Sequence, residues 1–135
     1  MAIRKNEFLE VRVAKADFTM LSSAATQSLP SGVWLPGGAL VTGVTFLDTD
    51  TMVVANASQT FDLRVANTAL SSSIALISTE HCKDVGAISV PYVASLVSAA
   101  GMYVAVPGEL VLSIQAAAGN SVMTYSPSVY VGYIV

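Results

Sequence analysis

Charge is the first thing that this sequence lacks. Its 135 residues include six Lys or Arg and nine Asp or Glu, so only 11% of the chain is charged and the formal net charge is −3. Globular domains usually carry about 25% charged residues. A nucleic-acid-binding protein needs a basic surface, which six cations among nine anions do not supply. Intrinsic disorder needs low hydropathy, whereas 53% of this chain is hydrophobic, so both classes are excluded.

Cysteine and continuous apolar runs are also scarce. Cys82 is the single cysteine, which excludes a disulfide scaffold. No apolar segment follows the first charges of the N-terminus, so we expect no cleavable signal peptide. Polar and turn-forming residues interrupt every long uncharged stretch, whereas a membrane-spanning helix needs about 20 consecutive apolar residues. A two-span membrane protein is therefore the weaker interpretation, and we expect a soluble protein with no membrane partner. The uncharged stretches are 18–47, 85–108 and 110–135.

What the sequence does contain is a series of short alternating segments. In 59–66, Phe61, Leu63 and Val65 alternate with polar residues, which predicts a strand with one buried face. In 8–18, Val11 and Val13 alternate with Glu10 and Arg12, and we expect the valines to face the core. The other segments that we expect to be strands are 40–47, 74–77, 102–106, 109–117, 122–125 and 129–134.

Three segments are harder to assign. Residues 24–31 are rich in Ser, Thr, Gln and Pro, a composition typical of a loop. The next apolar residues, 33–35, lie between two Pro-Gly-containing turns, so they form either a very short strand or an apolar loop anchor. Residues 91–100 have apolar positions that suit either a short helix or another β segment.

Short strands that alternate with turn signals, together with little helix, predict an all-β protein. About eight antiparallel strands in this length favour a jelly-roll-like sandwich of two sheets. The sequence contains no internal repeat of the kind that a solenoid needs, so we do not expect a solenoid. We therefore expect one β-sandwich domain over 8–135, preceded by a short N-terminal arm over 1–7.

Nothing in the chain predicts a catalytic or metal centre. His81 and Cys82 are adjacent, so in a strand they would point to opposite faces and could not form a catalytic pair. With Glu80 and Asp84 they lack the spacing of a zinc finger, and we expect a polar surface loop there. A metal held between subunits at a symmetry axis stays open as an alternative.

Two turn-like segments also lack the partners that a ligand site needs. Residues 48–50, Asp-Thr-Asp, lack the glycine and distal glutamate of a calcium-binding EF-hand loop, so we expect a hairpin turn. Residues 36–38, Pro-Gly-Gly, follow no strand-to-helix pattern that would cradle a phosphate. We therefore expect no enzyme, no metal and no cofactor.

The larger aromatic side chains leave a second function open. Gathered on one concave face, they would form a platform for sugar rings, and the chain would be a carbohydrate-binding or fibre-type adhesion module. Tyrosines more often fill sandwich cores and interfaces. A small jelly-roll protein that assembles a shell by itself is a third alternative. The aromatic residues considered are Trp34, Tyr92, Tyr103, Tyr125, Tyr130 and Tyr133.

Three segments resemble a known family of virus proteins. Residues 35–44 read Leu-Pro-Gly-Gly-Ala-Leu-Val-Thr-Gly-Val, similar to the Leu-Pro-x-Gly-Ala-x-Val entry to a strand in small tailed-phage capsid proteins. Residues 61–66 are similar to a Phe-x-Leu-x-Val-Ala strand of those proteins. Residues 101–112 and 129–135 match their final hairpin and their last Val- and Tyr-rich strand. The sequence thus resembles the jelly-roll cement, or decoration, proteins of tailed-phage heads.

The resemblance implies a structural role without catalytic residues. A cement protein binds the outside of the capsid, where it joins neighbouring subunits of the major capsid protein as a homodimer or homotrimer, and it is made in the host cytoplasm. Sparse charge suits such a surface, because interface cores are depleted in charged residues. The charged N-terminal segment suits an arm added to a neighbouring chain. The interface residues that we expect in this arm are Ile3, Arg4, Lys5 and Phe8.

Overall fold

The computed structural model describes residues 10–18, 27–48, 53–54, 60–67, 73–81, 91–98, 100–115, 123–124 and 127–135. These residues form eleven strands and no helix, most of them in two antiparallel sheets. The prediction of an all-β, jelly-roll-like sandwich is confirmed. The five-stranded sheet contains β1 (Val11–Asp17), β11 (Pro127–Ile134), β3 (Ala39–Asp48), β7 (Tyr92–Ala94) and β8 (Met102–Val104). The four-stranded sheet contains β2 (Gln27–Leu35), β9 (Gly108–Gln115), β5 (Thr60–Ala66) and β6 (Ser73–His81).

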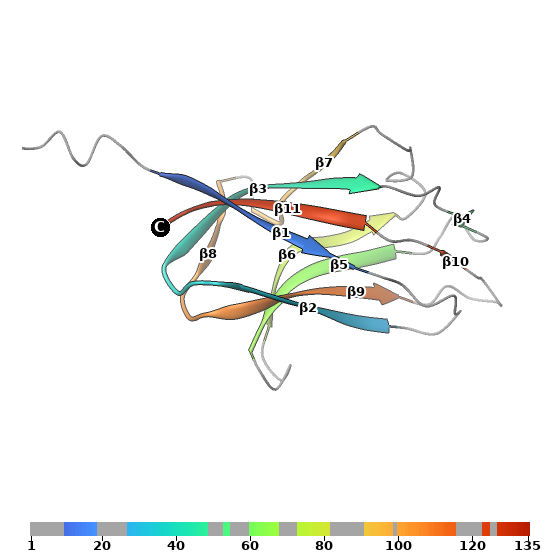
Figure 1. The fold of residues 1–135 in the computed structure, drawn as a ribbon, viewed down its shortest axis with the longest axis horizontal. Coiled ribbons are helices and arrows are strands. Elements are labelled where there is room, and N and C mark those ends of the chain that lie inside the picture. The colour runs from blue at the N-terminus through green and yellow to red at the C-terminus, as the bar shows by residue number, and fades with distance from the viewer. Residues whose placement is uncertain are drawn as a thin grey trace, which may run out of the picture.

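The strand order is that of a jelly roll. The order is β1-β11-β3-β7 in one sheet and β2-β9-β5-β6 in the other, so successive strands mostly alternate between sheets. In Figure 1, β3 and β11 run side by side, and β5, β9 and β2 run side by side beneath them. The two-residue strands β4 (Val53–Val54) and β10 (Met123–Thr124) form a separate ladder. Both β7 and β8 pair with β3, so they occupy a single interrupted strand position.

The core lies between the two sheets. Phe46 of β3 and Phe61 of β5 meet edge to face with ring centroids 5.1 Å apart, an arrangement that the aromatic quadrupole favours. Phe61, Leu63 and Val65 all point inward, as their alternation predicts. The fully buried leucines and isoleucine that surround these rings are Leu35, Leu63, Leu76, Ile77, Leu110 and Leu112.

The loop prediction for 24–31 is wrong where the structure describes it. Residues 27–31 belong to β2, which pairs with β9 on one side only. An edge strand tolerates Pro30, because no ladder hydrogen bond is needed on its open side. A bulge between Pro30 and Trp34 interrupts the pairing, and Gly32 lies there with φ +74°. The polar composition thus marks a bulged edge strand.

The face prediction for β1 is also wrong. Val11 and Val13 are 63% and 62% exposed, whereas Ala16 is fully buried and Ala14 packs against the core. Alternation identifies the strand but not which face is inward. Small alanines suit the inner side here, because β1 and β2 lie close together at this edge of the sandwich. The two valines are left on the outside.

The segment 91–100 contains a strand rather than a helix. After β7 the chain leaves the sheet and returns at β8, a detour that passes the edge of the other sheet. Within it, the Val97 N–H donates to the Leu76 carbonyl of β6 over 2.9 Å. This bond ties the two sheets together along the side opposite β1. No helix among the described residues is long or apolar enough to cross a bilayer.

Candidate protein-interaction surface

The interface residues expected in the N-terminal arm, Ile3, Arg4, Lys5 and Phe8, lie outside the described residues and stay predictions. His81 ends β6, so its backbone is part of the four-stranded sheet and not of a loop, while Cys82 lies outside the described residues. Within the described ranges, no three His, Cys, Asp or Glu side chains gather as metal ligands.

The aromatic residues do not gather on one described face. Trp34 is 43% exposed on the outside of β2. On the outside of the other sheet, Tyr103 is 63% exposed on β8, and Tyr130 lies on β11 near Lys15. Tyr92 and Tyr133 pack against the core, and Tyr125 lies outside the described residues. A shared platform for stacked sugar rings is not formed by these described side chains.

A row of apolar side chains crosses the outer face of the five-stranded sheet. The register pairs Val11 with Ile134, Ile134 with Leu40, and Leu40 with Tyr103. The buried neighbours of these residues on the same strands point into the core. They include Ala39 and Val41 beside Leu40, and Val104 beside Tyr103. Val11 and Tyr103 are each 63% exposed, and Ile134 and Leu40 are half-buried. We call these four residues the apolar row.

Two glycines lie in the next row. Gly132 pairs directly with Gly43, and Val13 completes this row at the edge. A Cβ atom built on Gly43 would meet nothing within 4 Å, and one on Gly132 would meet only the Thr42 hydroxyl at 3.6 Å and the Gly43 carbonyl at 3.9 Å. Apart from the Thr42 hydroxyl, which donates to the Gly132 carbonyl over 3.3 Å, the described side chains leave this point of the sheet uncovered. We call the Gly43–Gly132 pair the glycine gap.

These two glycines differ from the others in the fold. Glycine is required where the backbone is left-handed, as at Gly32, or where a side chain would collide, as a Cβ on buried Gly108 would collide with Val65. Neither reason applies to Gly43 or Gly132, because neither has a positive φ and the space beside each is open. A bulge follows Gly132, but it does not require a left-handed residue there.

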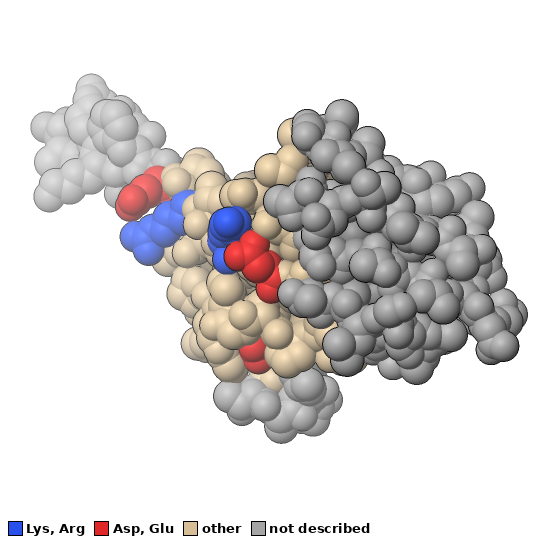
Figure 2. All heavy atoms as spheres, turned by 45° about the vertical axis from the view of Figure 1, so that its right-hand side comes forward, with Lys and Arg blue, Asp and Glu red and all other residues tan. Residues whose placement is uncertain are grey.

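Among the residues that the structure describes, the charged side chains of this outer face lie at its edge. Lys15 and Asp17 lie on β1, with the ammonium 3.7 Å from the carboxylate, and the Lys15 ammonium also lies 6.0 Å from the centre of the Tyr130 ring. Asp17 accepts a hydrogen bond from the Ser128 hydroxyl over 2.6 Å. In Figure 2 most blue and red atoms of the described surface form one band, and a separate red patch lies below it among tan atoms. The centre of the sheet face is uncharged.

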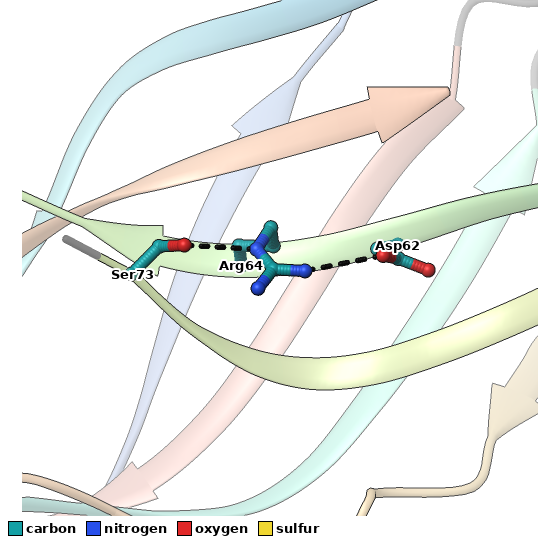
Figure 3. Close-up of polar contacts among 3 residues, drawn as sticks. All are labelled: Asp62, Arg64 and Ser73. Carbon is teal, nitrogen blue, oxygen red and sulfur yellow. Dashed lines mark hydrogen bonds and ion pairs between the residues drawn. The ribbon is translucent and has the colours of Figure 1, made fainter. Parts of the chain in front are cut away.

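The outer face of the four-stranded sheet is built differently. Arg64 lies across it, and its Nη1 donates to Asp62 over 3.1 Å while its Nε donates to the Ser73 hydroxyl over 2.9 Å (Figure 3). Small side chains surround the guanidinium and leave a shallow polar hollow of about 190 Å³. The hollow is lined by Ser28, Arg64, Ala66, Ser73, Val111 and Ser113. This part of the face is polar and shallow, and its Arg64 and Asp62 are paired with each other.

One end of the sandwich carries an apolar hollow of about 220 Å³. It lies where the chain passes from β8 to β9, and thus from one sheet to the other. Exposed Tyr103 and Val106 flank it, together with Ile74 of β6. Tyr103 belongs both to this hollow and to the apolar row, so the two apolar surfaces are continuous.

Reasoning from sequence missed this surface. The strands β3 and β11 were predicted, but the pairing of Gly43 with Gly132 depends on register across 89 positions of sequence. The one available signal was glycine inside a β-rich segment, since such a residue often marks close approach of another backbone or ligand.

A scan against protein-family models gives no match to this chain. A search of curated proteins gives no match either. Among solved structures, a chain of the cyanophage Pam1 capsid asymmetric unit aligns with a TM-score of 0.60 and 21% identity, over 94% of this chain and 86% of that one. This likeness establishes a shared fold over nearly the whole chain. A chain of infectious bursal disease virus, Gt strain, aligns over 93% of this chain and 33% of its own, at 9% identity and a TM-score of 0.38, which is too low to indicate a shared fold.

Proposed function

We propose that this chain is a structural protein of a virus particle, a cement protein that binds the exterior of a tailed-phage capsid and joins neighbouring major capsid protein subunits. It acts as a small homo-oligomer and as a binding protein, not a catalyst. The observation that carries the proposal is the fold shared with a chain of a phage capsid asymmetric unit, because the alignment spans most of both chains.

The chemistry of the surface supports the same proposal. Protein interfaces are depleted in charge at their centres, and the described charged side chains on the outer face of the five-stranded sheet lie along β1. The apolar row and the hollow beside Tyr103 are large exposed apolar features of the kind that mark interaction sites. Attachment at several points lets weak individual contacts hold a shell together, because each bound copy raises the local concentration for the next contact.

The proposal is tested by co-sedimentation with capsids of the virus that carries this chain, prepared without it. We expect the purified chain to pellet with these capsids at a saturable ratio and to raise the temperature at which they break open. Bovine serum albumin serves as the non-binding control. A chain that stays in the supernatant at every concentration would contradict the cement function.

A further inference from the structure

The glycine gap needs an explanation from outside the chain. A glycine inside a strand costs roughly 0.5–1 kcal/mol relative to alanine, because it orders a freer backbone and packs no side chain. Gly43 and Gly132 are paired in neighbouring central strands, where this cost is incurred twice. Neither a positive φ nor a close contact within the chain requires these glycines. The Thr42 hydroxyl donates to the Gly132 carbonyl over 3.3 Å, and the rest of this exposed backbone is available to another molecule.

The surface beside the gap has the complementary shape. The apolar row lies two residues from the gap along β1 and β11, which is about 7 Å. Along β3 it lies three residues away, because the bulge adds Thr42. Its inner members, Leu40 and Ile134, follow the same two strands that carry the glycines. The apolar row and the glycine gap are therefore neighbours on one face of the sheet.

We propose that this face binds a second copy of the chain, with the apolar row of each copy seated over the glycine gap of the other. A two-fold axis that lies between the facing sheets, across the strands and midway between the two rows, produces this arrangement. Leu40 of one copy then lies over Gly43 of the other, and Ile134 over Gly132. Such a contact uses the same patch on both copies, as closed dimers do. This deepens the proposed function, and rests on it only in that joining capsid subunits calls for an oligomer.

The charges are compatible with this occupant. A strongly acidic or basic partner would need opposite charge on the face, but Lys15 and Asp17 are already paired with each other at its edge. Two identical faces repel only where like charges meet, and no described charge lies in the apolar row or the glycine gap. The face is thus suited to a second uncharged face of the same kind.

The size of the face indicates a weak dimer. Four strand positions and seven residues of strand length cover a flat footprint of about 400 Å² per copy. Two copies together fall below the roughly 1,200 Å² at which stable interfaces begin. We therefore expect the dimer to dissociate with a dissociation constant in the micromolar range.

The test measures mass against concentration by sedimentation equilibrium, using the full chain and three variants. The 14.0-kDa chain should shift from monomer to dimer as concentration rises. Gly43→Val fills the gap with a side chain that suits a strand, so the dimer dissociation constant should rise by at least about tenfold. Val11→Asp, at an exposed position of the apolar row, should raise it as well. Ser113→Val, on the outer face of the other sheet, is the matched control and should leave it unchanged.

Thermal unfolding first establishes that each variant is folded, and Val11→Asp carries the test if Gly43→Val is not. A chain that stays monomeric, a trimer, or a dimer that tolerates both variants would overturn the inference. Capsid binding is scored separately. A monomer that pellets with capsids keeps the cement function but refutes the dimer, and loss of that binding in Gly43→Val assigns the gap to the capsid protein instead. A dimer that does not pellet refutes only the cement function.

Discussion

The two sheets share one core but present opposite surfaces to the outside. The five-stranded sheet exposes an apolar row beside uncovered backbone, and its charge lies at the β1 edge. The four-stranded sheet has a polar hollow lined by serines and by Arg64, whose charge is met by Asp62 on the same strand, and it also exposes Trp34. The five-stranded sheet thus leaves apolar side chains and backbone exposed to solvent, whereas the charged side chains at the hollow of the four-stranded sheet bind each other. A surface can have little net charge because it is apolar or because its charges are paired within the chain. Only the apolar kind indicates a binding partner.

Loss of the shared core should have the largest effect and should not distinguish the two faces. Phe61→Ala removes a ring that is 1% exposed and in edge-to-face contact with Phe46. We expect the free energy of unfolding to fall by about 3–5 kcal/mol, because a cavity replaces the ring. Urea unfolding followed by far-UV circular dichroism measures it. A loss comparable to that of a surface substitution would contradict the placement of Phe61 between the sheets.

The glycines of the two sheets should respond in opposite ways to alanine. Gly108→Ala places a methyl group against Val65 in the packed interior and should cost about 1–3 kcal/mol of stability. Gly43→Ala meets no neighbour and restricts only the unfolded chain, so stability should stay equal or rise by about 0.4–1 kcal/mol. Both are measured by the same urea titration, each serving as the other's control. Equal losses would show that Gly43 serves the fold and not a partner.

Removal of the guanidinium from the polar face should have the smallest effect. Arg64→Met keeps most of the aliphatic stem but breaks the contacts to Asp62 and Ser73. The side chain of Arg64 is 34% exposed, and partly solvated pairs contribute little, so we expect a loss of up to about 1 kcal/mol in thermal unfolding. Mass and capsid binding should not change. A change in either would mean that the four-stranded sheet also binds a partner.

The strands that sequence reasoning predicted well are those whose alternation is enforced by the core. In β5, every second residue is a large apolar side chain, and no other register would bury all three. Residues 27–31 were missed because β2 is an edge strand, where Pro30 and a bulge are tolerated and local composition imitates a loop. The orientation of β1 was wrong because its inward side chains are alanines, which carry little hydrophobic signal beside two valines.

Sequence reasoning could predict that the candidate surface is poor in charge, but not where it lies. Scarce charge indicated a covered exterior, and the structure locates an apolar face that fits this expectation. The position of the face was beyond sequence reasoning, because Gly43 and Gly132 become neighbours only through the pairing of β3 with β11. The interface residues expected in the N-terminal arm stay predictions.

The hydrogen bond from Val97 to Leu76 protects a strand edge through which copies of the chain could otherwise join into fibres. A sandwich with open strand edges can add further strands without limit and grow into fibres, a particular hazard when few charges keep molecules apart. Here the detour between β7 and β8 interrupts one edge and ties it to the other sheet. Pro30 and the neighbouring bulge disrupt the edge of β2, and three charged side chains lie on β1, with Glu10 directly before it. With three edge strands blunted in this way, association is steered toward sheet faces, where contacts can close.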